Sequence, residues 1–559
     1  MKQYEGVTAN LPQATTVLGL DSIDLRRLSW TARFLEDYCH DFGRLEPFFV
    51  GPPTAPDTWR RAITERQKRS GAARGIADIT TRQLTARGAP AEALAAAARL
   101  RDSETVCVVT GQQAGLFGGP MFTLLKAMTA IKVARQVTAE HGVPTVPVFW
   151  VDAEDHDLAE INTCGVLTSD LEPRSVSLSL AGAANRPAAT VELPSSVTDV
   201  LTELRALLPP TEFSDDLFDQ LSVTYRPDVS IVDAFARWLE LILGPHGLVV
   251  FDASDGAAKS LVQSIFSREL EVVGQTSRLA AAAGDELTRL GYHAQVTPSP
   301  DAVSLFSLDG GRNAIRRHNG DDDSFDVGPD RQSVAELRRR VERDPSAFSP
   351  NVLLRPVVQD TLFPTVGYVA GPSELAYLGQ LRKVYEHFDV PMPVICPRAT
   401  VTLADRSMLK FLARYPVGFE NLQAQDDGVL NRLLASLLPA SVEQAVVEAE
   451  QAVASRLTAL ASQVSEVDPT LVGAVDTTRG KMERDIRQLR GKIVQAAKRR
   501  DETLRRQFHR ARNQAFPGGD PQERSVSGVY FLNRYGPHLV DQLLDDLPVE
   551  IGQHWLVTV

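Results

Sequence analysis

Residues 105–150 constrain the fold most, because they predict a strand, a loop, a helix and a second strand in direct succession. The β-branched, apolar run at 105–109 leads into the polar, glycine-containing stretch 110–119. A helix-compatible stretch follows from about 120 to 140, and the apolar run 143–150 predicts the second strand. This order is that of a βαβ unit with buried parallel strands. Ligands of open α/β sheets bind beyond the carboxyl ends of such strands.

The chain has 559 residues, more than one core usually holds, so we expect several structural units. Later segments predict a buried strand at 248–252, a strand of a smaller sheet at 303–308, strand and loop at 351–356, and a helix at 372–387. The expected units are a helical part of the core at 1–100, the first half of the core at 101–170, a connecting insertion at 171–245, the second half of the core at 246–430 with a second insertion at about 290–350, an antiparallel coiled coil at 431–515, and a C-terminal segment packing on the core at 516–559.

The coiled coil is predicted by apolar residues spaced three and four apart. One series runs from Val442 to Val464 and a second from Met482 to Ala496, with Asp468-Pro469 between them as a helix breaker. The pattern predicts a helical hairpin with an apolar seam that a second subunit can cover. A hairpin packed on its own chain would give the same pattern.

Composition excludes several classes of protein. The net charge is −12, which disfavours general binding of nucleic acid. Four cysteines without a CxxC pair disfavour a zinc cluster and a disulfide framework, and Cys107 is expected to be a buried, inert thiol. The N-terminal sequence does not resemble a signal peptide, and no apolar run approaches the ~20 residues of a membrane span. We therefore expect a cytoplasmic protein.

The first candidate site follows the first strand of the βαβ unit, at Thr110, Gly111, Gln112 and Gln113. Glycine lets the backbone approach a ligand, the next helix can offer free N–H groups to an anion, and the two amides can donate and accept hydrogen bonds. A tight turn without a ligand is the alternative. Neither GxxxxGK[ST] nor GxG occurs, which disfavours a P-loop NTPase or a conventional NAD enzyme.

The second candidate site follows the second strand, where Glu154, Asp155, His156 and Asp157 crowd together after Asp152. Crowded titratable groups shift each other's pKa and suit acid–base catalysis or amine binding. The alternatives are an acidic helix N-terminus and, less favoured, a divalent metal held by His156 and a carboxylate. No second histidine lies nearby, so we predict no metal site.

The third candidate site lies in the second half of the expected core. Arg355 can hold a carboxylate through two parallel hydrogen bonds, and an internal salt bridge is its alternative role. The polar residues that accompany it are Gln359, Asp360, Glu374 and Tyr377.

Four segments together resemble the bacillithiol biosynthesis cysteine-adding (BshC) family. They are TGQQAGLFGGP at 110–120, VPVFWVDAEDHDLAEIN at 146–162, LLRPVVQDTLFPTVGYVAGPSELAY at 353–377 and PGGDPQERSVSGVYFLNRYG at 517–536. The resemblance implies a Rossmann-like core of the nucleotidyltransferase type with connecting-peptide insertions, and a C-terminal coiled coil that makes a dimer. It also implies a ligase that joins L-cysteine to glucosaminyl-malate through an amide bond.

For that reaction, the chemistry of the candidate residues suggests the following hypothesis about their roles. Gln112, Gln113 and Arg355 would hold malyl or phosphate oxygens, one of Glu154, Asp155 and His156 would bind or deprotonate the amine, and Asp360, Glu374 and Tyr377 would recognise the sugar. Amide formation requires an activated carboxyl group, so ATP is a candidate cosubstrate. However, the chain lacks the HxGH-type and KMSKS-type signatures of nucleotidyltransferases. The alternatives are another carboxylate–amine ligase or nucleotidyltransferase on the same core, and a non-catalytic coiled-coil scaffold that binds a metabolite.

Overall fold

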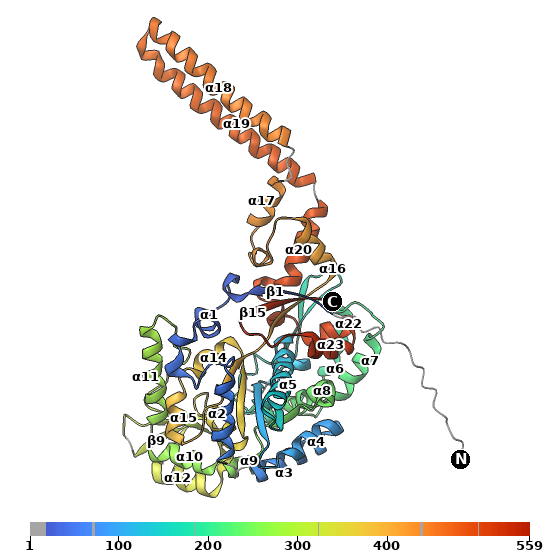
Figure 1. The fold of residues 1–559 in the computed structure, drawn as a ribbon, viewed down its shortest axis with the longest axis vertical. Helices are drawn as coiled ribbons and strands as arrows, with labels where there is room; N and C mark the ends of the chain where they lie inside the picture. The colour runs from blue at the N-terminus through green and yellow to red at the C-terminus, as the bar shows by residue number, and fades with distance from the viewer. Residues whose placement is uncertain are drawn as a thin grey trace, which may run out of the picture. The chain divides into compact units, whose positions relative to one another are not determined.

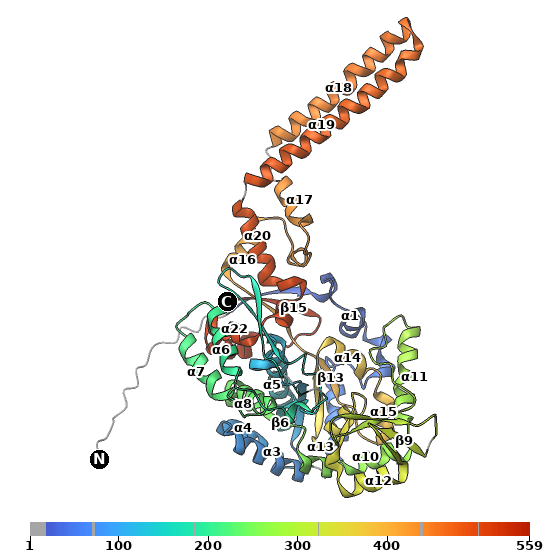
Figure 2. The same ribbon diagram turned by 180° about the vertical axis from the view of Figure 1, so that it is seen from behind.

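The computed structural model describes residues 18–69, 73–180, 182–183, 185–321, 323–436, 440–500 and 502–559. Its internal contacts divide the chain into two compact units. The first comprises Met1–Ser169, Pro173–Leu403 and Gln522–Val559, and the second comprises Asp170–Glu172 and Ala404–Pro521. Figures 1 and 2 show the elements of both units from opposite sides.

The α-helices of the first unit are α1 (Arg33–His40), α2 (Pro56–Gln67), α3 (Ala73–Arg87), α4 (Ala91–Arg99), α5 (Met121–His141), α6 (Val197–Leu207), α7 (Ser214–Thr224), α8 (Ile231–Leu243), α9 (Gly256–Leu261), α10 (Gln263–Glu271), α11 (Gln275–Arg289), α12 (Val334–Arg343), α13 (Arg355–Leu362), α14 (Pro372–Leu378), α15 (Arg382–Phe388), α21 (Gln522–Ser525), α22 (Gly528–Tyr535) and α23 (His538–Asp546). The expected helix at 120–140 is confirmed as α5. The single helix expected at 372–387 is wrong, because residues 379–381 separate α14 from α15.

The central sheet is parallel and has the strand order β13-β12-β2-β3-β6. Its strands are β2 (Val106–Gln112), β3 (Thr145–Val151), β6 (Val249–Asp252), β12 (Thr365–Ala370) and β13 (Val394–Pro397). β2 and β3 are the strands of the expected βαβ unit, and β6 is the strand expected at 248–252. Their near-continuous burial is typical of parallel strands covered on both faces.

The order of the strands creates a switch point between β2 and β12. From β2 the chain adds β3 and β6 on one side, and it then returns to add β12 and β13 on the other. Loops at the carboxyl ends of β2 and β12 therefore diverge, which opens a crevice at that edge. Trp59 and Ile63 of α2 and Val133 of α5 belong to the apolar core that supports these strands. Cys107 is fully buried in β2, so the expected burial is confirmed, and burial raises the pKa of its thiol.

A second sheet, antiparallel and five-stranded, has the order β10-β9-β8-β7-β11. Its strands are β7 (Ala302–Ser307), β8 (Asn313–Arg317), β9 (Ser324–Val327), β10 (Asp330–Ser333) and β11 (Phe348–Pro350). The expected strand at 303–308 is confirmed as β7. The strand expected from residue 351 is wrong, because β11 ends at Pro350 and α13 begins at Arg355 with Pro356 in its first turn.

The first unit also contains a hairpin of β4 (Thr163–Leu167) and β5 (Pro173–Ser177), and a three-stranded sheet in the order β1-β15-β14. The latter joins β1 (Gly19–Asp24), β15 (Gln553–Thr558) and β14 (Thr400–Ala404). The expectation of an all-helical segment at 1–100 is therefore wrong at β1, which pairs antiparallel with the distant β15. The limits expected for the two insertions, 171–245 and about 290–350, stay a prediction.

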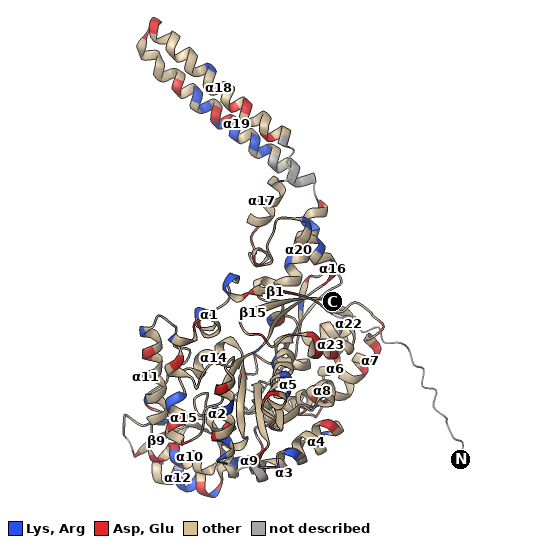
Figure 3. Ribbon diagram, in the orientation of Figure 1, with Lys and Arg blue, Asp and Glu red and all other residues tan. Residues whose placement is uncertain are grey.

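The second unit consists of α16 (Arg406–Arg414), α17 (Gly428–Ser436), α18 (Ala440–Val467), α19 (Val472–Arg500) and α20 (Glu502–Ala515). Figures 1 and 2 show α18 and α19 side by side as an antiparallel hairpin. Asp468 accepts a hydrogen bond from the Thr470 amide at 2.8 Å and starts the turn, so the helix break expected at Asp468-Pro469 is confirmed. Figure 3 shows long uncharged stretches between the charged residues of α18.

Among the helices of the described residues, none combines the length and the apolar character that crossing a membrane requires.

Candidate active site

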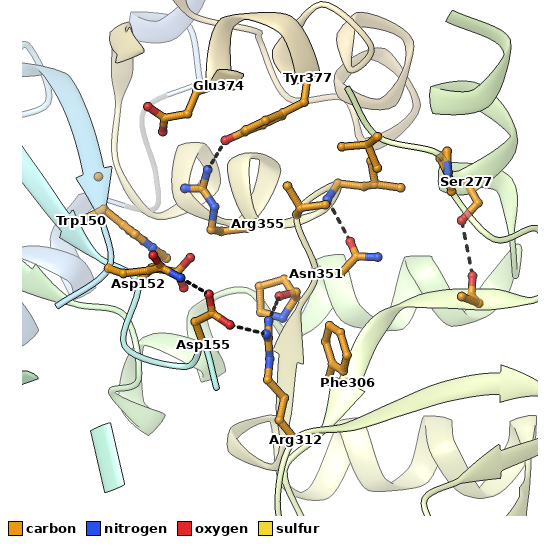
Figure 4. Close-up of a pocket in the computed structure, with 18 of the residues that line it drawn as sticks. Trp150, Asp152, Asp155, Ser277, Phe306, Arg312, Asn351, Arg355, Glu374 and Tyr377 are labelled. Atoms are coloured by element: carbon orange, nitrogen blue, oxygen red, sulfur yellow. Dashed lines mark hydrogen bonds and ion pairs between the residues drawn. The ribbon is translucent and has the colours of Figure 1, made fainter. Parts of the chain in front are cut away.

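A cavity of about 520 Å³ lies at the carboxyl edge of the central sheet, within the first unit. Residues after β2, β3 and β12 form one wall, and the second sheet with the 296–299 loop forms the other. Figure 4 shows polar side chains from both walls converging on this space. The volume is in the range of about 300–1,000 Å³ that is typical of small-molecule sites. The cavity therefore lies where the strand order places a ligand.

Glu374 lines the sheet-side wall of the cavity, and the buried Lys126 holds it in position. Lys126 of α5 is 1% exposed, and its ammonium donates to Glu374 Oε2 at 2.5 Å, to Gln112 Oε1 at 3.2 Å and to the Gly111 carbonyl. Tyr368 and the Gly371 amide also donate to Glu374, each at 2.8 Å. Burial raises the pKa of Glu374, but Lys126 and the Gly371 amide outweigh it and lower the pKa overall. Glu374 is therefore an ionised carboxylate that three donors hold in position.

Asp155 joins the two walls of the cavity. Its carboxylate accepts from Gln113 Nε2 at 2.5 Å and from Arg312 Nη1 at 3.3 Å, and the His156 amide donates to it at 2.7 Å. Burial raises the pKa of Asp155, but these donors outweigh burial and lower the pKa overall. Arg312 stacks over the Phe306 ring, 4.1 Å from its centroid. Its buried Nε has no acceptor among the described residues, so it can donate to a ligand.

Arg355 starts α13 and extends its guanidinium into the cavity (Figure 4). Nη2 donates to the Tyr377 hydroxyl at 2.5 Å and Nη1 donates to Gln359 Oε1 at 3.2 Å. Neither partner is a carboxylate, and no described carboxylate oxygen lies within 4.0 Å of the guanidinium. The internal salt bridge considered for Arg355 is therefore not formed in the described chain, and its charge remains available for an anionic ligand.

The side chains of Trp150 and Asp152, also in the sheet-side wall, have no hydrogen-bond partner among the described residues. Trp150 is 3% exposed, and its indole N–H has no acceptor among the described residues. Asp152 lines the cavity, and no described side chain or amide donates to its carboxylate. Strand periodicity places both on the same side of the chain at the end of β3. Unpartnered, partly buried donors and acceptors in a cavity are expected to bind ligand atoms.

The candidate residues of the sequence divide into two groups. The cavity brings together Gly111, Gln112, Gln113, Asp155, Arg355, Glu374 and Tyr377. It does not include Thr110, Glu154, His156, Asp157, Gln359 or Asp360. Glu154 is buried and pairs with Lys259 at 2.5 Å, while the Thr110 hydroxyl donates to the Val369 carbonyl at 2.9 Å. The acidic helix N-terminus considered for 154–157 is wrong, since no helix follows those residues before β4.

His156 and the Gln359–Asp360 pair lie beside the cavity. The His156 side chain is partly exposed, with Nδ1 3.4 Å from Arg312 Nη1. Gln359 and Asp360 are buried in α13, where Asp360 accepts from Gln359 at 3.0 Å and from the Tyr385 hydroxyl at 2.6 Å. Burial raises the pKa of Asp360, with Arg66 opposing the shift. Among the described residues, no cluster of three or more His, Cys, Asp or Glu side chains could hold a metal ion.

The glycine-rich loop before α5 does not form the anion cradle considered for it. The Leu116 amide donates to the Ile161 carbonyl at 2.7 Å, the Gly118 amide to the Tyr225 hydroxyl at 2.9 Å, and the Met121 amide to the Val526 carbonyl at 2.8 Å. A Cβ on Gly115 would lie 2.7 Å from the Gly119 Cα, so glycine is required by close packing of the loop on itself. The start of α5 therefore does not fit a phosphate group.

Several residues of the site were not predicted from the sequence: the buried Lys126, which contacts the cavity wall, and the lining residues Trp150, Ser277, Phe306, Arg312, Asn351 and Tyr368. One of them carries a signal, because Lys126 is the lone charge in the apolar stretch 121–131. A single charge on a buried helical face needs a partner. Arg312 carries no comparable signal, since its contact with Asp155 depends on how the second sheet packs against the central one.

A polar cavity at the switch point of a parallel sheet defines an α/β protein that binds a small metabolite. Two family models match the chain: "Bacillithiol biosynthesis BshC, N-terminal Rossmann-like domain" at residues 20–399 and "Bacillithiol biosynthesis BshC, C-terminal coiled-coil domain" at residues 401–559. The chain therefore belongs to the bacillithiol biosynthesis BshC family. The resemblance inferred from the four sequence segments is confirmed, and so are the Rossmann-like core and the C-terminal coiled coil.

Similar proteins match over nearly their whole length and carry the name "Putative cysteine ligase BshC". The protein of Salinibacter ruber is 34% identical over 94% of this chain and 95% of its own length. The protein of Koribacter versatilis is 33% identical over 94% of this chain and 97% of its own. The protein of Symbiobacterium thermophilum is 33% identical over 92% and 95%, respectively.

Proposed function

We propose that this protein is a cysteine ligase of bacillithiol biosynthesis, which joins L-cysteine to glucosaminyl-malate through an amide bond. The observation that carries the proposal is the cavity at the switch point, in a chain that belongs to the BshC family. The names of the similar proteins support the activity. Buried polar groups without a described partner, such as Trp150 Nε1 and Arg312 Nε, support the binding of a polar ligand in this cavity.

The charges of the cavity match the charges of the two substrates. Cysteine has an ammonium and a carboxylate, and glucosaminyl-malate has an amine and two carboxylates. Arg355 and Arg312 can each donate to a carboxylate through groups that no described acidic residue fully occupies. Gln112 and Gln113 add amide groups on the sheet-side wall, and these amides are partly used by Lys126 and Asp155. We therefore assign carboxylate binding to the arginines.

Three residues hold the binding groups in position. Asp155 accepts hydrogen bonds from Arg312 and Gln113 and so orients both side chains. Lys126 donates to Gln112 and Glu374 and fixes them in the same way. Tyr377 restricts Arg355 through its hydroxyl, and both residues line the cavity. Tyr377 and Glu374 are also placed to contact sugar hydroxyls. Fixed donors around a reaction centre stabilise the oxyanion that develops when an amine attacks a carboxyl carbon.

The carboxyl group of cysteine must be activated before the amine attacks it, and ATP is the candidate source of that activation. The loop at 115–121 does not fit a phosphate, since its amides donate within the chain. No step is therefore assigned to ATP at that loop.

We also propose that the α18–α19 hairpin joins two copies of the chain. Val447, Leu460, Met482 and Leu489 of the hairpin are each more than 40% exposed. Large apolar side chains exposed along a two-helix hairpin fit a surface that a partner covers. The cytoplasm is the compartment that we propose, because the four cysteines are free in the described chain and fit a reducing environment.

The test of the proposed function is a mass-spectrometric assay of purified protein with cysteine and glucosaminyl-malate. Three reactions are compared: without a nucleotide, with ATP and Mg²⁺, and with pre-activated cysteinyl adenylate. Product in the second or third reaction supports the ligase, and product in the third alone means that another enzyme or cosubstrate activates cysteine. Absence of product in all three overturns the proposed substrate pair.

A further inference from the structure

The backbone of Asp152 is held by a hydrogen bond, whereas its side chain faces the cavity. The residue follows β3, and its amide donates to the Gln112 carbonyl at 3.0 Å, which ties it to the end of β2. The carboxylate faces the cavity, beside Asp155 and Trp150 (Figure 4). The backbone position is therefore set by the parallel register of the two central strands.

Asp152 differs from the other carboxylates at the cavity by its partners. Glu374 is occupied by Lys126, Tyr368 and an amide, and Asp155 by Gln113, Arg312 and its own loop. By contrast, no described group donates to Asp152, and no described cationic nitrogen lies within 4.0 Å of its oxygens. Within the described part of the cavity wall, Asp152 is the carboxylate whose lone pairs are left for a ligand.

The surroundings of Asp152 make it a stronger base than an ordinary aspartate. Burial raises its pKa most, and the charges of Asp155 and Glu374 act in the same direction. Arg355 and Arg312 oppose the shift, but the net change is upward. Proton transfer is most effective when the pKa of the catalytic group approaches the working pH.

We propose that Asp152 is the general base that accepts the proton of the glucosaminyl amine as this amine attacks the activated carboxyl group of cysteine. The inference rests on the proposed ligase function and adds the identity of the base. The activated species is a mixed anhydride of the cysteine carboxyl group with a phosphate group. The amine nitrogen forms a bond to the carboxyl carbon, the bond from that carbon to the phosphate oxygen breaks, and the phosphate leaves with the electron pair. The proton lost by the nitrogen moves to Asp152 Oδ.

The experiment compares three variants with the wild type. Asp152→Asn keeps the shape of the side chain and removes the base, so we expect kcat to fall by about 10²- to 10⁴-fold. Asp152→Glu restores a base at a longer reach and should recover part of the activity. Glu160→Gln removes an exposed acid of the same segment that does not line the cavity, and it should keep wild-type kcat. Calorimetric titration with glucosaminyl-malate should show binding to Asp152→Asn within a few-fold of the wild type.

The pH profile separates catalysis from a structural effect. Wild-type kcat/KM should fall on the acidic side as Asp152 becomes protonated, Asp152→Glu should keep this acidic limb, and Asp152→Asn should lose it. Full kcat in Asp152→Asn overturns the inference and leaves the ligase function standing. Loss of glucosaminyl-malate binding in Asp152→Asn also overturns it, because the role is then in binding. A wild type that makes no product in any of the three reactions described above overturns the ligase function and this inference together.

Discussion

Glu154 offers a test of whether a crowded acidic residue supports the fold or the chemistry. Its carboxylate and the ammonium of Lys259 are 7% and 4% exposed, and they lie 2.5 Å apart. Lys259 also donates to the Phe348 carbonyl of β11 at 2.5 Å, so the pair links the end of β3 to the second sheet. Glu154→Gln should therefore destabilise the first unit, because it leaves the Lys259 ammonium buried without an opposite charge.

The magnitude follows from the burial of both partners. Removing one member of a buried ion pair costs about 3–5 kcal/mol, and the glutamine oxygen can still accept one hydrogen bond, so we expect about 3 kcal/mol. Urea unfolding followed by circular dichroism and by tryptophan fluorescence measures the loss. Replacing both residues, as Glu154→Leu with Lys259→Met, should recover most of it because no charge is then buried.

The control and the activity assay decide between the two roles. Glu160→Gln removes an exposed acid nearby and should change stability by less than about 0.5 kcal/mol. Turnover per folded molecule of Glu154→Gln should stay near that of the wild type, since Glu154 does not line the cavity. Wild-type stability combined with lost turnover in Glu154→Gln would refute the reasoning and favour a catalytic Glu154.

Three further predictions concern acid stability, ligand binding and assembly. Burial lowers the pKa of His554 to about 4, whereas histidine in the unfolded chain has a pKa of about 6.5. The unfolded chain therefore binds a proton between these pH values while the folded chain does not, so stability is full above about pH 6.5 and is lost as the pH falls towards 4. Urea midpoints at pH 7 and pH 5 should show a loss of about 2 kcal/mol in the wild type and a smaller loss in His554→Asn. Trp150→Phe removes an indole N–H that has no described acceptor, and calorimetry should show weaker substrate binding with little change in melting temperature. If the proposed dimer forms, Met482→Lys with Leu489→Lys should convert it to a monomer, as measured by light scattering, since both side chains are exposed apolar groups of α19.

Each of these outcomes has a result that contradicts it. An equal pH effect in His554→Asn would assign the acid loss to other groups. Unchanged affinity in Trp150→Phe would mean that the indole N–H faces no ligand atom. A dimer that survives the paired lysine substitutions would place the subunit interface outside this part of α19.

The core of the fold could be predicted because its signals are local. The apolar runs at 105–109 and 143–150, with a helical stretch between them, show the hydrophobic pattern and the bounding turn residues of a βαβ unit. The strand β1 could not be predicted in this way, since its six residues GLDSID are mostly polar or exposed and gain their conformation by pairing with β15. Because β1 and β15 are far apart in the sequence, a short stretch of sequence does not show that they pair.

The location of the candidate site could be predicted more reliably than the side chains that face the ligand. The carboxyl ends of β2 and β3 lie at the cavity, as the βαβ unit indicates. However, crowding of charge at Glu154–Asp157 does not show which groups face the ligand, because that depends on partners from distant segments. Lys259 forms an ion pair with Glu154, and Arg312 forms an ion pair with Asp155.

The partners of each carboxylate therefore rank the acids of the site in a way that sequence spacing cannot. At Glu374, the buried Lys126 favours the ionised form more than burial opposes it, so the pKa is lowered and the lone pairs of the carboxylate accept from groups of the protein. Such a group orients its neighbours but is a poor proton acceptor. A carboxylate that is partly buried and unpartnered keeps its lone pairs and gains basicity from burial, as Asp152 does. The same sheet edge thus supplies both kinds of group, and the difference between them depends on the buried cations that reach each acid.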